Sequence, residues 1–286
     1  YVAKKFPPEA KAKAQAMIVN VMKAFDNRIE NLPWMTKATK ENAKIKLNKF
    51  RVKIGYPDQW KDYSALEVKS PEQGGTYFEN SRIYAQWGHN ENMADLGKPV
   101  DKEEWGMSPQ TVNAYFNPAN NEIVFPAAIL QPPFYDYQAD EAVNYGGIGA
   151  VIGHEISHGF DDSGSRYNAE GNLVNWWSDE DLKQFTTMGT ALADQYSALE
   201  PLPGIFVDGK FTLGENIGDL GGVNAAYDGL QIHLKEKGNP GLIDGYTPDQ
   251  RFFISWATIW RSKMRDEAIK NQVKTDPHSP GMYRAY

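Results

Sequence analysis

Two histidines and a glutamate near the middle of the sequence have the spacing of a metal site. His154 and His158 are four positions apart, so on a helix they lie on one face and can bind the same zinc ion. Glu155 lies one step round the helix, where it is a poor ligand but can take a proton from a metal-bound water. The pattern predicts a metallopeptidase site. The alternative interpretation is a solvated helix face with two surface histidines.

A catalytic zinc needs a third protein ligand, which must come from elsewhere in the chain. The 286 residues include no Cys, which excludes disulfides, thiolate ligands and a cysteine nucleophile and leaves a carboxylate or a distant His. Glu215 is the best candidate, because it lies at the head of a helical pattern. Asp219 follows one turn later on the same face, where it could orient a ligating imidazole. Alternatively, both acids complement the helix dipole.

Polar residues in two further segments could take part in the chemistry. Asp161 and Asp162 follow the histidine motif, and either could accept the second N–H of a ligating imidazole or be a plain turn residue. Near the end of the chain, His278 and Arg284 lie in a Pro-rich segment, 276–284. His278 could donate to a developing oxyanion and Arg284 could bind a substrate carbonyl or carboxylate, unless their presence there is incidental.

The elements expected to position these residues are mainly helices, with a small sheet. Residues 1–50 predict two helices around a break at Leu32-Pro33-Trp34. A helix capped by Asp140 or Asn144 should carry the histidine motif and end at Gly159. Further helices are expected at about 77–95, 178–199, 215–236 and 248–270, and a strand pair at Thr111–Phe116 and Asn121–Phe125.

Composition narrows the possible partners. The net charge of −7 gives no basic field for phosphate backbones, so we expect no nucleic-acid partner. The longest apolar run, around 148–152, is far shorter than the roughly 20 residues of a membrane span. The chain opens at Tyr1 without an initiator Met, so we expect a piece of a longer protein. We treat 1–286 as one catalytic metallopeptidase domain, with 1–100 a mostly helical packing region and 101–286 the active-site core.

Several blocks, taken together and in this order, resemble the neprilysin and endothelin-converting-enzyme family of zinc peptidases, including its bacterial oligopeptidases. The resemblance covers nearly the whole chain. It is carried by the segments Val112-Asn113-Ala114-Tyr115-Phe116, Ile123-Val124-Phe125-Pro126-Ala127, Ile129-Leu130-Gln131-Pro132-Pro133-Phe134, 144–162, Gly214-Glu215-Asn216-Ile217-Gly218-Asp219 and 276–284.

This resemblance implies a thermolysin-like (gluzincin) catalytic domain with one zinc ion. The implied ligands are His154, His158 and Glu215, with Glu155 as general base. His278 is implied as the group that stabilises the transition state. It also implies Asp219 as the partner of a ligating histidine, with Asp161 the weaker candidate for such a role.

The resemblance further implies how a peptide is held. Asn113 and the backbone of Ala114 would form an edge strand that pairs with the extended substrate, and Arg284 would grip the substrate beyond the scissile bond. A large apolar residue after the cut would enter a pocket, although ordinary core packing is the alternative for each of its residues. The pocket residues would be Ile129, Phe134, Val151 and Trp260.

We therefore predict a zinc endopeptidase that hydrolyses oligopeptides and prefers a large apolar residue after the scissile bond. Members of this family are much longer chains with an additional N-terminal helical lobe, which would be a partner of this one. One alternative is a zinc-binding fragment that is catalytically incomplete without that lobe, and another is a carboxydipeptidase. The resemblance also implies that animal members are disulfide-bonded surface proteins, so the lack of Cys here favours a bacterial origin and, with it, an extracytoplasmic location in the periplasm, the cell envelope or the medium.

Overall fold

The computed structural model describes residues 1–285 and divides into two compact units. The larger unit joins Tyr1–Tyr56 to the residues from Met107 onward, and the smaller unit is Pro57–Gly106. The larger unit comprises α1 (Val2–Lys5), α2 (Pro8–Asn31), α3 (Lys37–Asn48), β1 (Arg51–Gly55), β2 (Tyr115–Asn117), β3 (Glu122–Pro126), α5 (Glu141–Asn144), a π-helical turn (Tyr145–Gly149), α6 (Ala150–His158), a 3-10 turn (Gly164–Arg166), α7 (Asp179–Ser197), α8 (Leu213–Lys237), α9 (Pro248–Ile259), α10 (Asp266–Thr275) and α11 (Gly281–Arg284).

Three short strands form one sheet in the order β1-β3-β2. Strands β2 and β3 are antiparallel, joined by a turn in which Asn121 adopts a φ of 48°. The predicted strand pair is thus present, but the first strand is shorter than predicted, since residues 111–114 lie outside it. Strand β1 was not predicted. It follows α3 directly and runs parallel to β3, with Val52 opposite Ile123. Within residues 1–285, no strand pairs with the outer side of β2, which is therefore an edge.

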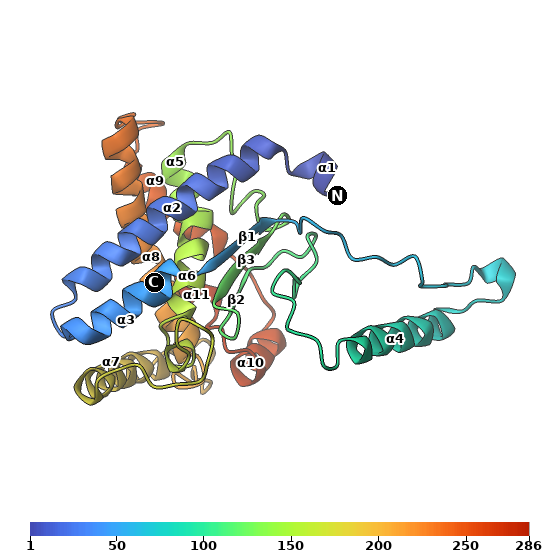
Figure 1. Ribbon diagram of the computed structural model, residues 1–286. Helices are drawn as coiled ribbons and strands as arrows, with labels where there is room; N and C mark the ends of the chain where they lie inside the picture. Colours follow the sequence, from blue (N-terminus) through green and yellow to red (C-terminus); the bar gives the residue numbers. More distant parts are fainter. Residues whose placement is uncertain (286) are drawn as a thin grey trace. The chain divides into compact units, whose positions relative to one another are not determined.

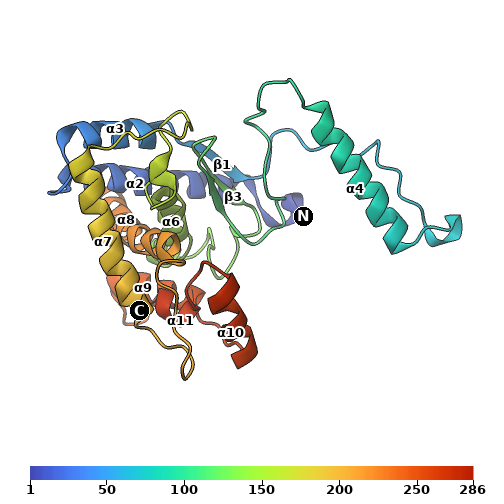
Figure 2. The ribbon, with the colours of Figure 1, turned by 90° about the horizontal axis from the view of Figure 1, so that it is seen from below.

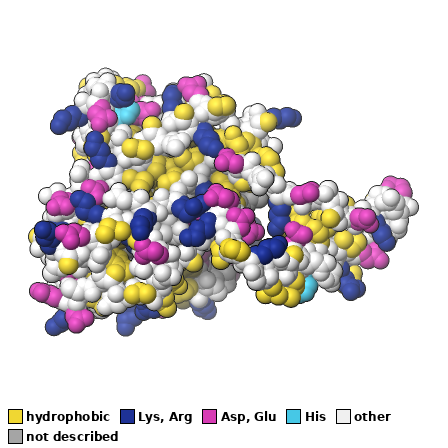
Figure 3. Space-filling model, viewed as in Figure 1, with side chains coloured by type: hydrophobic (Ala, Val, Ile, Leu, Met, Phe, Trp, Pro, Cys, Tyr) yellow, Lys and Arg dark blue, Asp and Glu magenta, His cyan; other side chains and the backbone are white. Residues whose placement is uncertain are grey.

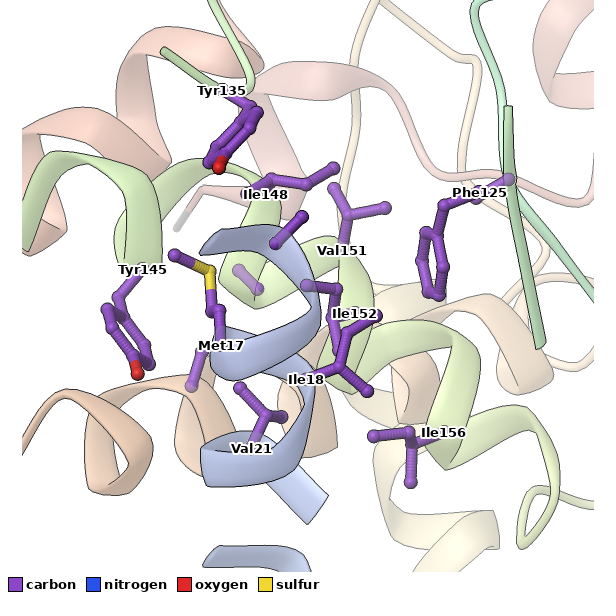
Figure 4. Packing of buried hydrophobic residues seen from close by; sticks show 14 of the residues in the cluster. Met17, Ile18, Val21, Phe125, Tyr135, Tyr145, Ile148, Val151, Ile152 and Ile156 are labelled. Carbon is purple, nitrogen blue, oxygen red and sulfur yellow. The ribbon is translucent and has the colours of Figure 1, made fainter. Parts of the chain in front are cut away.

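Helix α6 is held in the larger unit by two long helices. It packs against α8, and α2 packs against both (Figures 1 and 2). In Figure 4, Met17, Ile18 and Val21 of α2 lie beside Ile152 and Ile156 of α6. Each such buried apolar side chain contributes roughly 1.5–3 kcal/mol. This apolar layer fixes the histidine helix from the side opposite its polar face.

The predicted helix that ends at Gly159 is present, with a change of pitch inside it. Asp140 is the residue before α5, but its carboxylate binds Arg251, at 2.8 and 3.2 Å, and does not cap the helix. In the π-helical turn, Gly146 and Gly147 lie where neighbouring backbone leaves no room for a Cβ. An ideal Cβ on Gly146 would lie 2.1 Å from the carbonyl oxygen of Phe252. Helix α6 continues to His158.

The single helix predicted at 248–270 is wrong, because the chain forms two helices there. A capping box between Thr247 and Gln250 starts α9, which ends at Ile259, and α10 begins only at Asp266. The backbone at Trp260 packs closely on a later segment, since a Cβ on Gly281 would lie 2.7 Å from the Trp260 carbonyl oxygen.

The smaller unit has one long helix, α4 (Tyr77–Ala94), and a 3-10 turn at Pro71–Gln73. The helix starts at a capping box between Thr76 and Glu79, and its Trp87 packs against the rings of Tyr63 and Tyr84. The helices predicted at 77–95, 178–199 and 215–236 are thereby confirmed as α4, α7 and α8.

The distribution of surface charge and the length of the helices bear on which partners the protein can have. On the face drawn in Figure 3, acidic and basic side chains are interspersed and form no field of one sign. None of the helices described in residues 1–285 combines the length and the apolar character that crossing a bilayer requires.

Candidate active site

Helices α6 and α8 bring three potential metal ligands together. His154 and His158 project from one face of α6, with their rings 4.5 Å apart and nearly perpendicular. Glu215 comes from the first turn of α8, and its Oε2 lies 3.1 Å from His154 Nε2 and 3.7 Å from His158 Nε2. One donor atom from each residue lies within 4.8 Å of the others, so the three can share one ion.

Glycines on the two helices allow this close approach. A Cβ on Gly153 of α6 would lie 2.6 Å from the carbonyl oxygen of Gly222, and a Cβ on Gly218 would lie 2.7 Å from the ring of His154. On α8, Gly221 faces Ser157 in the same way, at 2.2 Å. The lack of side chains at these glycines therefore allows the two ligand helices to lie this close together.

A carboxylate holds the inner nitrogen of each histidine. His154 Nδ1 lies 2.9 Å from Asp219 Oδ1, and His158 Nδ1 lies 2.7 Å from Asp161 Oδ2. Asp161 is itself fixed by the backbone N–H groups of Ser163 and Gly164. Of the two acids that follow the motif, Asp161 is thus the one placed against a histidine. A carboxylate at Nδ1 leaves the Nε2 lone pair of each ring directed at Glu215.

This donor set fits a divalent cation. Glu215 Oε2 is buried and makes no well-formed hydrogen bond with any residue in 1–285, although imidazole Nε2 atoms surround it. Acceptors that face one another in this way need a positive charge between them. Two imidazoles and a carboxylate are the ligands that catalytic zinc takes in thermolysin-type sites.

Glu155 stands next to the ligands without joining them. Its side chain is 5% exposed and lines the cavity beside His154 and His158. Burial raises the pKa of Glu155 above its usual value, against the charges of the two histidines. A carboxylate with a raised pKa is a stronger base, which suits it to receive a proton from water.

The cavity at this site measures about 1000 Å³ and is lined by the residues that the sequence suggested for substrate binding. Ile129, Phe134, Val151 and Trp260 all lie on its wall, together with Asn113 and Ala114. Asn113 and Ala114 precede strand β2, which begins at Tyr115, and do not form part of it. Moreover, the Ala114 N–H donates to the side-chain oxygen of Asn113 at 2.9 Å, so it is engaged within the chain.

Arg284 lies in the same cluster, bound to a residue that also holds a histidine. Its Nε and Nη2 donate to the two oxygens of Asp219, at 2.6 and 2.7 Å, and its guanidinium stacks 3.7 Å from the ring of Trp260. Burial raises the pKa of Asp219, but Arg284 and His154 outweigh it and hold this pKa below its usual value. The sequence alone did not indicate this pairing.

His278 reaches the metal ligands from the C-terminal loop. Its Nε2 lies 3.0 Å from Glu215 Oε2 and its Nδ1 lies 2.6 Å from Asp276 Oδ1, and these two carboxylates, Glu215 first, raise its pKa. Asp276 was not predicted from the sequence. The signal that could have indicated it is an acidic residue two positions before a histidine. The loop is tied to α8 by Ser279, which donates to Asn216 at 2.8 Å.

A helix with two histidines four positions apart, completed by a glutamate from a second helix and a free glutamate beside them, defines a zinc peptidase of the thermolysin type. Profiles described as peptidase family M13 match residues 113–286 and 1–57. The chain belongs to that family, the neprilysin family of zinc metallopeptidases, and the resemblance noted in the sequence is confirmed.

Individual relatives support the same assignment. Neprilysin-3 of Drosophila melanogaster is 40% identical over 292 residues, which cover 99% of this chain and 37% of that protein. Human neprilysin is 37% identical over 296 residues, which cover 99% of this chain and 39% of that protein. The chain thus spans about two fifths of the length of these relatives.

Solved structures confirm the predicted fold class. The zinc metalloprotease ZMP1 of Mycobacterium tuberculosis, in complex with an inhibitor, superposes with a TM-score of 0.92 at 49% identity, covering all of this chain and 43% of that one. PepO from Lactobacillus rhamnosis gives a TM-score of 0.85 at 35% identity, again covering all of this chain and 43% of that one. The mainly helical chain with its small sheet therefore has the thermolysin-like fold of these peptidases.

Proposed function

We propose that this protein is a zinc-dependent endopeptidase that hydrolyses oligopeptides. One observation carries the proposal: two histidines, each held by a carboxylate at Nδ1, converge with Glu215 beside a buried glutamate in a peptide-sized cavity. One zinc ion held by His154, His158 and Glu215 would act as a Lewis acid and lower the pKa of a water molecule at its open position.

The residues around the metal ligands each have a separate role in the reaction. Glu155 takes the proton of the attacking water and delivers it to the departing amine. His278, held at Nδ1 by Asp276, donates from Nε2 to the oxyanion of the tetrahedral intermediate. Asp219 and Asp161 keep the two imidazoles in the tautomer that presents Nε2.

The cavity wall supports a preference for a large apolar residue after the scissile bond. Ile129, Phe134, Val151 and Trp260 give one region of the wall an apolar character, and β2 is the edge of the sheet, where an extended peptide can add as a further strand. Asn113, which precedes that strand, lies within the cavity and offers an amide to the substrate backbone.

An endopeptidase is favoured over a carboxydipeptidase by the state of Arg284. A carboxydipeptidase needs a cation free to bind the terminal carboxylate, whereas Arg284 gives Nε and Nη2 to Asp219. We expect a peptide and its C-terminally amidated form to be cleaved at rates within about threefold of each other, because a lost carboxylate–arginine pair would cost more than tenfold. A larger loss on amidation would favour the exopeptidase.

The relatives' length suggests a second contribution to the site. Since this chain covers about two fifths of the neprilysins that it matches, we propose that an N-terminal helical lobe of the same protein completes the substrate cavity and limits the size of the peptide. We also propose an extracytoplasmic location. Cleavage by residues 1–286 alone, compared with the full-length protein, separates an autonomous catalytic lobe from a zinc-binding piece that needs its partner.

The central test is Glu155→Gln in the full-length protein. This variant should bind zinc as the wild type does, because Glu155 is not a ligand, and should lose about 10²–10⁴ of kcat on an internally quenched peptide. A chelator should abolish wild-type cleavage, and zinc should restore it. Full turnover by the variant would remove Glu155 as the base, and chelator-resistant cleavage would remove the metal.

A further inference from the structure

A buried lysine outside the peptidase motif binds the turn that follows it. Lys46 of α3 is 1% exposed, and its Nζ donates to the backbone carbonyl oxygens of Gly159, Gly164 and Tyr167, at 2.6, 2.7 and 2.6 Å. An ammonium group has three N–H donors, so these carbonyls satisfy it completely. Burial lowers the pKa of Lys46 to about 7, against the attraction of Asp161, so the charged form depends on these acceptors and the burial of a lysine here needs an explanation.

The turn that Lys46 binds is the one that orients a metal ligand. Gly159 follows His158 directly, and Gly164 donates its own N–H to Asp161 Oδ1 at 2.6 Å. The other oxygen of Asp161 holds His158 Nδ1. Lys46 therefore binds the turn at three points: Gly159 at its start, Gly164, whose N–H anchors Asp161, and Tyr167 at its end. Short hydrogen bonds link the lysine to the imidazole through this backbone.

The surroundings of the ammonium group keep it on this turn. The rings of Phe116, Phe160 and Trp176 lie 5.8, 5.6 and 5.8 Å from Nζ, within cation–π range. Trp176 also donates its indole N–H to the carbonyl oxygen of Tyr167, which Lys46 shares. The aromatic faces stabilise the positive charge without offering it another hydrogen-bond acceptor.

We propose that Lys46 is a positioning residue for the metal site: it fixes the turn 159–167 so that Asp161 holds His158 with Nε2 directed at Glu215. The inference rests on the proposed zinc site and adds a residue from the N-terminal part of the chain to it. Without Lys46 the turn loses three anchors, Asp161 is no longer held in register with the ring, and His158 samples orientations that do not bind the metal.

The test measures zinc affinity, by competition with a chromophoric chelator, in folded variants of the full-length protein. Lys46→Met should weaken zinc binding about 10–100-fold, the range for losing a carboxylate that orients a ligand. Asp161→Asn should weaken it similarly. If Lys46 acts through Asp161, the double variant should bind no more weakly than the weaker single variant, because the second change removes nothing further.

Lys53→Met is the matched control. Lys53 is also buried, at 8% exposed, but it pairs with Glu122 in the sheet, at 2.8 Å. This variant should lose stability and keep its zinc affinity. If Lys46→Met does not fold, Lys46→Arg takes its place, because arginine keeps the charge but its planar fork cannot converge on three carbonyls.

Two results would overturn the inference while leaving the zinc site intact. One is a zinc affinity of the Lys46 variant equal to that of the Lys53 variant, and the other is losses that multiply in the double variant. A wild-type protein that binds no zinc would instead refute the proposed metal site, and the inference with it.

Discussion

Replacing Gly218 by alanine tests whether the glycines between the ligand helices set the geometry of the metal site. An ideal Cβ at this position lies 2.7 Å from both Cε1 and Nδ1 of His154, whereas ordinary contact begins at 3.4 Å. The ring must therefore move by about 0.7 Å, which exceeds the tolerance of about 0.5 Å for a working site. The same movement strains the bond between His154 Nδ1 and Asp219.

The change from Gly218 to alanine has two opposing effects on the free energy of unfolding. Alanine in a helix gains about 1 kcal/mol over glycine, while overpacking costs about 1–3 kcal/mol, so the metal-free variant should lose about 0–2 kcal/mol of unfolding free energy. Zinc affinity should fall about 10–100-fold, or about 1.4–2.8 kcal/mol, because the displaced ring no longer points at the ion.

The assay pairs chelator competition for zinc with denaturant unfolding in excess chelator. Gly189→Ala is the control, since Gly189 lies inside α7 and its nearest neighbour would be an ordinary 3.5 Å contact with Leu213. It should gain about 1 kcal/mol and bind zinc unchanged. If Gly218→Ala behaved like this control in both measurements, the argument that glycines set the ligand spacing would be refuted.

Asp219→Asn should leave the buried Arg284 without its counter-charge, costing about 3–5 kcal/mol of unfolding free energy at neutral pH. The pKa of Asp219 is depressed in the folded protein, so its contribution to stability is complete above its ordinary pKa of about 3.8 and fades as the pH falls below that value. Urea unfolding should therefore show that the stabilities of the wild type and the variant differ at neutral pH and approach each other at acid pH. The pH profile of kcat/KM should be bell-shaped. Activity should fall as the pH drops through the raised pKa of Glu155, because its base form is needed, and should fall again as the pH rises through the raised pKa of His278, because its cation is needed. Asp276→Asn should move only the alkaline limb, to lower pH, since it removes one of the carboxylates that keep His278 protonated; an unmoved limb would contradict the role of His278.

The sequence predicted elements well wherever local signals were strong. The break between α2 and α3 carried a proline, and the hairpin of β2 and β3 had β-prone runs around turn residues. Strand β1 was missed because its pairing with β3 joins residues about 70 positions apart, which no local pattern reveals. The gap between α9 and α10 was missed because residues 260–265 include no Gly or Pro to mark it.

Site residues within a recognisable spacing could be proposed from the sequence, as could Asp219 and Asp161 as partners of the histidines, but pairings between distant segments could not. His154, His158 and Glu215 have residue types and positions along the chain that by themselves suggest metal ligands. The attachment of Arg284 to Asp219 depends on how α11 meets α8, a contact across 65 residues of sequence. Lys46 gave no signal, because a lysine on a helix is ordinarily solvated and only the folded chain shows it buried.

The position of Asp219 couples two binding events. The same carboxylate accepts from Arg284 and holds His154, so any ligand that draws Arg284 away changes the charge felt by a zinc ligand. Linkage makes this effect reciprocal: the factor by which such a peptide changes zinc affinity equals the factor by which zinc changes the affinity for that peptide. Substrate binding would thus change the affinity for zinc, and zinc binding the affinity for substrate, through the shared carboxylate of Asp219, even where substrate and metal make no direct contact.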